Sequence, residues 1–481
     1  MHIGIIGGGL SAYLLAYRLR GYGHTLEIFE DASNAGGNCH TTDVNVASFA
    51  RWADLAVNDF NAPMYRDVVD IMDSLGVGYA PLEDTASFYS TDGSVGYTLD
   101  GGWGTAAPAA FEHLYSVFAA RAWDVMNDPS YASTTVAQFL AKEPPFASNE
   151  AFASQCVLPR VNAMYFCAPE GPGAMPIQTA YLYYLFQEGF GTDSYASPNG
   201  PAPMVNRQYF VLGARSFVDA LRENAKASGA TIRSGAPASV IPSTAGARIQ
   251  QGSGYFGPFD AVVMTIHADQ ALAALPPSYD PEVLAMLRSV RYAPSVAYVH
   301  QDASLLPPPE LRRTYNVLVR GPGEPTAYSM TYVINQHQAD RENLKQRYFD
   351  CPEYYVSLNP VRTPANILVD QSTGKQAIYE FPHNVGDLGL RSAQTTLWRT
   401  QNPIQGRNKL YFAGGWTMGA GLMIECWQAV QELFGLLAGE KEAQAAYDEA
   451  RPVEHYAPRY IRRLRPPQSA VTLSRGSMRR S

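Results

Sequence analysis

The feature that most constrains the fold is a glycine-rich turn between a short apolar run and a helical pattern. Residues 2–7 read HIGIIG, which is typical of a strand buried on both faces of a parallel sheet. The turn at residues 7–9 follows, and apolar residues then recur at helical spacing over residues 10–21. Together these residues form a GxGxxA pattern, whose glycines allow a pyrophosphate to approach the helix N-terminus closely. The pattern predicts a dinucleotide-binding unit.

A second strand is predicted over residues 24–30 (HTLEIFE), and it ends at Glu30. A carboxylate at this distance from the turn can accept hydrogen bonds from both hydroxyls of an adenosine ribose. The alternative is a glycine turn followed by a surface glutamate. NAD uses the same pattern, but the doublet Gly36-Gly37 offers a second stretch of bare backbone to a longer cofactor. This second stretch favours FAD.

Length and charge narrow the class of protein. A chain of 481 residues exceeds what one hydrophobic core usually holds, so two domains are expected. The net charge of −8 argues against a nucleic-acid-binding protein. The five cysteines show no CxxC spacing, which predicts neither a disulfide framework nor a zinc or other metal site. No secretory signal and no apolar run of about 18 residues is visible, so we expect a cytoplasmic protein without a transmembrane segment.

Several segments beyond the turn resemble the flavin-containing amine oxidase superfamily, over most of residues 1–450. They include the glycine doublet, and the segments TYVINQHQ (331–338), VSLNP (356–360) and QGR through LYFAG (405–414). The chain is also similar to flavin-dependent polyunsaturated fatty acid isomerases, which share GG-x-CH-[ST] (here 36–41) and FPH (here 381–383) before the QGR block. The resemblance implies an α/β fold, in which a Rossmann-type FAD-binding domain of discontinuous segments joins an α+β substrate domain of the amine-oxidase type.

The resemblance also implies where the domains lie. The FAD-binding domain is expected over residues 1–61, 205–275 and 386–450, and the substrate-binding domain over residues 62–204 and 276–385. Within the second cofactor segment, Ser216 is a suitable N-cap for a predicted helix. Val240 lies in a predicted strand, where the superfamily meets adenine through its backbone. Residues 451–481 form a basic C-terminal tail, with seven arginines after residue 455.

The last cofactor segment predicts a strand, two glycine turns and a helix from Leu422. In the superfamily this helix N-terminus faces the pyrimidine edge of the flavin. Leu422 and Met423 would then favour negative charge on N1 and O2 of reduced flavin. Three positions depart from the family pattern: Asn38 replaces a basic residue, Ala56 a frequent glycine, and Gly415 an acid.

We expect noncovalent FAD, because the family's covalent cysteine motif near the C-terminus is absent. Cys39 and Cys426 are the alternatives for covalent attachment. The expected cofactor-binding residues are Gly7, Gly8, Gly9, Leu10, Ser11, Glu30, Gly36, Gly37, Asn38, His40, Val240, Gly414, Gly415, Leu422 and Met423.

Flavin chemistry needs little from protein side chains, so the sequence does not identify the catalytic residues. The candidates are His40, Tyr332 and His383, and a structural role is the alternative for each. We expect an FAD-dependent oxidoreductase, an oxidase or desaturase that acts on a C–N or C–C bond of an apolar or aromatic small molecule by hydride transfer to flavin N5. The alternatives are a redox-neutral double-bond isomerase of a fatty acid or related lipid, and a protein that keeps FAD structurally. The sequence leaves open a monomer or a homodimer.

Overall fold

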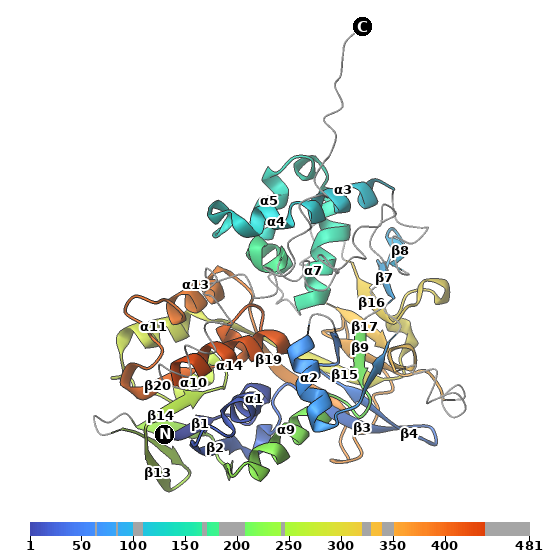
Figure 1. Ribbon diagram of the computed structural model, residues 1–481. Helices are drawn as coiled ribbons and strands as arrows, with labels where there is room; N and C mark the ends of the chain where they lie inside the picture. The colour runs from blue at the N-terminus through green and yellow to red at the C-terminus, as the bar shows by residue number, and fades with distance from the viewer. Residues whose placement is uncertain are drawn as a thin grey trace.

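Two large β-sheets, each built from segments far apart in the chain, form the frame of the molecule (Figure 1). The computed structural model describes residues 1–62, 65–82, 85–99, 109–165, 171–181, 207–241, 246–319, 329–338 and 351–437. The predicted basic tail, residues 451–481, lies outside the described residues.

The first sheet is five-stranded and parallel, in the order β10-β2-β1-β14-β20. Its strands are β1 (His2–Ile6), β2 (Thr25–Asp31), β10 (Thr231–Gly235), β14 (Ala261–Met264) and β20 (Leu410–Phe412). The central strands β1 and β14 are buried on both faces. Helices α1 (Leu10–Leu19), α9 (Arg215–Ala227) and α14 (Met423–Leu437) pack on one face of the sheet. The opposite face is covered by α10 (Ala268–Ala273), α11 (Pro281–Ser289), α13 (Leu388–Leu397) and the antiparallel sheet of β11 (Ala238–Ile241), β12 (Ala247–Gln251) and β13 (Gly254–Phe259). This arrangement confirms the predicted α/β fold with a Rossmann-type unit.

The second sheet is seven-stranded, in the order β19-β15-β18-β17-β16-β7-β8. It is antiparallel except where β16 runs parallel to β7. Its strands are β7 (Ala86–Tyr89), β8 (Gly96–Leu99), β15 (Tyr292–His300), β16 (Tyr315–Leu318), β17 (Met330–Val333), β18 (Tyr355–Leu358) and β19 (Ile378–Asn384). A short helix, α12 (Ile334–His337), follows β17.

Shorter elements join the two sheets. The hairpin of β3 (Thr41–Val46) and β4 (Phe49–Asp54) precedes a small sheet of β5 (Asp59–Asn61), β9 (Arg207–Phe210) and β6 (Tyr79–Pro81). The helices between residues 109 and 165 gather at the top of Figure 1, with α7 reaching down toward β16. These helices are α3 (Ala109–Ala120), α4 (Ala122–Asn127), α5 (Val136–Lys142), α6 (Glu150–Phe152) and α7 (Leu158–Tyr165). Helix α2 (Arg66–Leu75) precedes them in the chain and packs against α9 and α14.

The start of α9 differs from the sequence prediction. Ser216 does not cap this helix, because it lies inside the first turn and its hydroxyl bonds back to a nearby carbonyl. The Asp54 carboxylate instead accepts the N–H of Ala214 at 3.0 Å, and the Thr41 hydroxyl accepts the N–H of Arg215 at 3.0 Å. The cap therefore comes from the β3–β4 hairpin, which the sequence pattern around residue 216 does not reveal.

Candidate functional site

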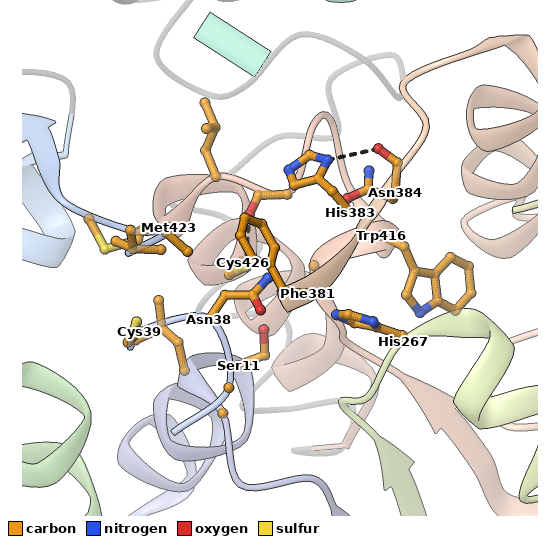
Figure 2. Close-up of a pocket in the computed structure, with 18 of the residues that line it drawn as sticks. Ser11, Asn38, Cys39, His267, Phe381, His383, Asn384, Trp416, Met423 and Cys426 are labelled. Carbon is orange, nitrogen blue, oxygen red and sulfur yellow. Dashed lines mark hydrogen bonds between the residues drawn. The ribbon is translucent and has the colours of Figure 1, made fainter. Parts of the chain in front are cut away.

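A cavity of about 620 Å³ is lined by residues of both large sheets. At one end its lining follows the carboxyl ends of β1, β2, β14 and β20, which is where open α/β sheets bind their ligands. At the other end the lining is a face of the seven-stranded sheet together with α7. Figure 2 shows the region between, where side chains from both ends surround the cavity. The cavity therefore connects the predicted cofactor segments with the predicted substrate segments.

Two glycines of the turn after β1 are packed so tightly that a side chain does not fit at either position. Gly7 has a φ of 126°, and a Cβ there would overlap the Thr265 hydroxyl. A Cβ on Gly8 would overlap the Glu30 side chain. Both glycines line the cavity, so backbone rather than side chain faces a ligand at this point.

The second glycine doublet lies directly against this turn. The Gly36 N–H donates to the carbonyl oxygen of Gly8 at 3.0 Å, and Gly36 forms a parallel bridge with Gly9. Gly9 is the N-cap of α1 and supplies no side-chain hydrogen bond. The N–H groups of Leu10 and Ser11 in the first turn have no intrahelical acceptors, and both residues line the cavity. An uncapped helix N-terminus that faces a cavity suits an anion such as a pyrophosphate.

Ten of the predicted cofactor residues line the cavity: Gly7, Gly8, Gly9, Leu10, Ser11, Gly37, Asn38, Gly415, Leu422 and Met423. The structure places the others elsewhere. Gly414 packs against the Ile266 carbonyl, where a Cβ would be too close for a side chain to be accommodated. Gly36 contributes the backbone contact to the first turn rather than lining the cavity.

Glu30 lies in the wall beneath the turn instead of facing the cavity. Its side chain is 1% exposed, and its carboxylate accepts hydrogen bonds from Arg222 at 2.9 Å and from the Tyr13 hydroxyl at 3.3 Å. The next residue, Asp31, lines the cavity at the end of β2. The predicted ribose contact of Glu30 would therefore require its carboxylate to turn away from Arg222.

Val240 is also placed differently from the expected adenine contact. Its N–H donates to the carbonyl oxygen of Ala274 at 2.9 Å, and its side chain is buried in the core. Its neighbours Ala238 and Ser239 line the cavity instead. The strand was predicted, but the residue that faces the cavity is not the one expected.

A glutamate side chain of α14 accepts hydrogen bonds from backbone N–H groups at the start of this helix. Glu425 is buried, and its carboxyl accepts the N–H groups of Ala420 and Leu422, each at 2.9 Å. Burial raises the pKa of Glu425 to about 7, although these backbone hydrogen bonds oppose the rise. The N–H of Leu422, predicted to face the flavin, thus already has an acceptor. Met423 lines the cavity and lies on the same side of the view as Cys39 in Figure 2.

The three candidate catalytic residues separate in the structure. His40 stacks on Tyr379 with ring centroids 4.2 Å apart and is not among the residues that line the cavity. Tyr332 lines the cavity. His383 also lines it, and its Nδ1 lies 2.9 Å from the carbonyl oxygen of Asn384 (Figure 2). A carbonyl only accepts, so Nδ1 carries the proton; burial lowers the pKa of His383 to about 4 and keeps the ring neutral at neutral pH.

Several cavity residues were missed by the sequence reasoning. His267 lines the cavity and stacks on Tyr292, with the ring centroids 4.8 Å apart. Trp416 lines it too, and its indole N–H donates to the Ile266 carbonyl at 3.2 Å. A tryptophan directly after the Gly414-Gly415 pair was the available signal. Arg160 and Arg207 also line the cavity, and no local pattern marks either of them.

The thiols and acids of the described residues form no obvious metal site. No group of three or more His, Cys, Asp or Glu suited to a metal ion occurs in this part of the chain. Cys39 and Cys426 are free, buried thiols that line the cavity, and burial raises the pKa of Cys426 to about 11. Among the described helices, none is long and apolar enough to cross a membrane.

Comparisons with known proteins agree with this geometry. Residues 5–75 match the family described as NAD(P)-binding Rossmann-like domain. No curated protein matches the sequence.

The chain is similar in structure to several solved proteins at low sequence identity. Cyclohexylamine oxidase from Brevibacterium oxydans IH-35A aligns with a TM-score of 0.61 at 13% identity, over 92% of this chain and 99% of that one. A putative protoporphyrinogen oxidase from Exiguobacterium sp. 255-15 aligns with a TM-score of 0.58 at 14% identity, over 91% and 98%. A fatty acid isomerase from P. acnes that produces CLA aligns with a TM-score of 0.59 at 15% identity, over 90% and 97%.

Proposed function

We propose that this chain, which has the fold of the flavin-containing amine oxidases, is an FAD-dependent oxidoreductase that acts on an apolar small molecule. The resemblance predicted from the sequence is confirmed at the level of the fold. The proposed reaction is the oxidation or desaturation of a C–N or C–C bond, with hydride transfer to the flavin.

One observation carries this proposal: the same cavity joins a bare helix N-terminus to an aromatic sheet face. The turn at residues 7–9 and the first residues of α1 supply backbone N–H groups suited to a pyrophosphate. The far end supplies Phe88, Tyr315 and Tyr332, which are suited to an apolar molecule. A dinucleotide seated at the turn with its reactive ring toward the sheet would meet such a molecule inside the cavity.

The described residues fit FAD, and each group of them has a role. The glycines would leave room for the pyrophosphate. Asp31 and Ser239 offer polar groups near the end of β2, and Asn38 and Met423 lie farther along the cavity. Bound FAD would supply the hydride acceptor. The chain itself would position the substrate and exclude water by means of the buried sheet face. Neutral His383 can accept a hydrogen bond through Nε2, whose lone pair remains when Nδ1 carries the proton.

A redox-neutral isomerase is the second candidate. Phe381 and His383, two residues of the FPH segment shared with the fatty acid isomerases, line the cavity. In this reaction the flavin would return the hydride to another carbon of the same substrate, so that the product has an unchanged mass.

The visible spectrum of the purified protein tests the cofactor. A two-band flavin spectrum, with the yellow colour released on heat denaturation and identified as FAD by mass, is the expected result. Colour that stays with the pellet would indicate covalent attachment and make Cys39 and Cys426 the first sites to test. A colourless protein that takes up no added FAD would contradict the proposal.

Substrate screening then separates the reactions. Oxygen consumption and product mass are followed together in the same sample. A product two hydrogens lighter supports an oxidase or desaturase, and an unchanged mass without oxygen consumption supports the isomerase. Flavin that no organic donor reduces would indicate a structural cofactor.

A further inference from the structure

The cavity wall between β20 and α14 is a short loop that folds back on itself. Gly415, Trp416, Ala420, Gly421 and Leu422 all line the cavity. Gly421 has a φ of 87°, and a Cβ there would overlap the carbonyl oxygen of Gly415. Backbone therefore forms part of the wall, and the groups that hold this loop also set the shape of the cavity.

Two buried polar side chains hold the loop. The Gln394 amide of α13 donates to the carbonyl oxygen of Gly419 at 2.8 Å. The Glu425 carboxyl of α14 accepts the N–H groups of Ala420 and Leu422, each at 2.9 Å. A Cβ on Gly419 would overlap the Glu425 carboxyl, so this carboxyl packs directly against the loop.

Both hydrogen bonds from the loop end on the same oxygen of Glu425, Oε2. The other oxygen, Oε1, can therefore carry a proton while Oε2 still accepts both N–H groups, since a protonated carboxyl keeps acceptor capacity. Glu425 can thus hold the loop in either charge state. Gain or loss of the proton changes the charge beside the cavity and leaves the hydrogen bonds of the wall in place.

The surroundings of Glu425 do not favour its charge. Arg18 of α1 and Asp67 of α2 contact side chains farther along α14. The titratable groups on the cavity side are the thiols of Cys426 and Cys39, and burial keeps both protonated because it raises their pKa values. Within the described part of the chain, Glu425 therefore has backbone partners and no cation. Burial raises its pKa to about 7.

The N-terminus of α1 lies in the same part of the cavity. Helices α1 and α14 pack against each other, and the Ser11 side chain interacts with the thiol of Cys426, the residue after Glu425. Leu10, Ser11 and Cys426 all line the cavity, and Figure 2 labels two of them. An anion bound at the free N–H groups of Leu10 and Ser11 would share this region of low dielectric with the Glu425 carboxyl. Two negative charges repel each other strongly in such a region.

We propose that Glu425 is a positioning residue that couples the binding of the cofactor pyrophosphate to the uptake of one proton. It acts through the backbone of Ala420 and Leu422, which it holds with and without the proton. A proton on Oε1 removes the repulsion between the carboxyl and the bound anion, so the protonated chain binds the cofactor more tightly. The inference rests on the dinucleotide site of the proposed function.

The direction of the pH dependence follows from this coupling. Below about pH 7 the folded apoprotein already holds the proton, and binding is strongest. Above this pH the apoprotein has lost the proton and binding has to recover it, so the affinity for FAD falls as the pH rises. His267 and His383, which also line the cavity, stay neutral in this range because burial lowers their pKa values.

Titration calorimetry of the wild type measures the coupling. The apoprotein is titrated with FAD, and with ADP-ribose, which carries the same pyrophosphate without a flavin, in two buffers of different ionisation enthalpy. At pH 7 we expect each bound ligand to bring about half a proton, because about half of the Glu425 groups are already protonated there. Between about pH 6 and 8.5 the affinity for FAD should fall at least about fivefold, as is typical of coupled sites. No proton uptake and a constant affinity would overturn the proposal, even if no variant folds.

Variants then assign the proton. Glu425→Gln keeps an amide oxygen for both N–H groups but has no titratable proton, so its FAD affinity should not change with pH. A merely structural role would lower the affinity equally at every pH. The matched control is Glu432→Gln, the same substitution at an exposed position of the same helix, which should keep the wild-type pH dependence. Asp54 titrates in the same range, since burial raises its pKa to about 8, so proton uptake that persists in Glu425→Gln would point to such a group and overturn the proposal.

The two proposals fail in different ways. Proton-coupled binding of ADP-ribose by a protein that takes up no FAD would contradict the flavoenzyme function and leave the role of Glu425 standing. FAD uptake without proton uptake would contradict the role of Glu425 alone. A protein that binds neither ligand would contradict both.

Discussion

Three buried carboxyl groups close to the cavity have very different surroundings. Asp59 is held ionised by Arg207 and His337, whereas Glu425 is surrounded by backbone N–H groups at the start of α14. Burial raises the pKa of Asp54 to about 8, although the Thr41 hydroxyl and the Ala214 N–H oppose the rise. A carboxyl group whose pKa is raised by burial binds its proton more tightly in the folded chain, and this has a consequence for stability.

Glu425 predicts a pH dependence of stability with a definite sign. Below about pH 4.5, the ordinary pKa of a glutamate, the group is protonated in the folded and the unfolded chain. Between pH 4.5 and about 7 the unfolded chain loses the proton while the folded chain keeps it. The free energy of unfolding therefore falls through this window, by about 3 kcal/mol at most, and this contribution is constant above it.

The measurement is guanidinium unfolding of the wild type and Glu425→Gln from pH 4 to pH 8. The difference between the two free energies should shift by the stated amount across this range, in favour of the variant at high pH. Parallel curves would show that Glu425 has an ordinary pKa in the folded chain.

Gly9→Ala is predicted to weaken FAD binding without unfolding the protein. A Cβ on Gly9 would lie 3.8 Å from the Gly37 Cα, an ordinary contact, so the fold tolerates it. The same Cβ would occupy space where the turn meets the pyrophosphate. We expect about tenfold weaker binding, equivalent to about 1.4 kcal/mol, in a titration of the apoprotein with FAD.

Gly435→Ala in α14 is the control for this change. A Cβ there would meet nothing within 4 Å, and a helical glycine gains about 0.5–1 kcal/mol of stability on replacement by alanine. FAD affinity should be unchanged in this variant. Equal affinities in both variants would exclude a close approach of the cofactor to Gly9.

At the level of elements, sequence patterns within one segment predicted the structure correctly. Contacts between segments far apart in the chain could not be predicted. The β1–turn–α1–β2 unit follows from the sequence because its strands, glycines and helix pattern all lie within residues 2–31. The cap of α9 could not be predicted, because Thr41 and Asp54 come from a hairpin that precedes the helix by about 160 residues. The same holds for Arg160 and Arg207, which only tertiary packing brings to one cavity.

The cap of α9 makes a prediction that separates the sequence pattern from the structure. Thr41→Val removes the hydroxyl that accepts the Arg215 N–H and donates to Asp54, leaving a half-buried donor without its acceptor. We expect a loss of about 1–2 kcal/mol in the free energy of unfolding, measured with urea. Ser216→Ala, which removes the N-cap expected from the sequence, should change it by less than about 0.5 kcal/mol. The reverse order of effects would show that Ser216 caps the helix in solution.

At the level of the whole molecule, the cavity couples FAD to the packing of both sheets. A ligand that binds only the folded chain raises its free energy of unfolding by about 2.7 kcal/mol at a concentration of 100 times Kd. We therefore expect the apoprotein to melt at a lower temperature than the FAD-loaded protein, with the difference growing as free FAD is added. A melting temperature that is independent of added FAD would contradict noncovalent binding to the folded state.

The fold and the class of cofactor site were open to prediction from sequence, but the substrate end was not. The glycine segments carry their signal in residue type and spacing, so ten of the expected residues do line the cavity. The contacts of Glu30 and Val240 depend on partners at Arg222 and Ala274, which spacing does not encode. The domain boundaries, the cytoplasmic location and the oligomeric state stay predictions.

The strand order of the first sheet determines when, during translation, this sheet can be completed. β1 leaves the ribosome before the other strands of this sheet, yet β20, which completes the sheet, and α14, which lines the cavity, are encoded after residue 409. At about 5–20 residues per second, the nascent chain waits roughly 20–80 s before the sheet that begins at residue 2 can close. During that interval the exposed edge of β14 has no β20 to pair with, so a chain released early would present that edge to chaperones or to other chains. Completion of the cofactor site therefore requires that translation has passed α14.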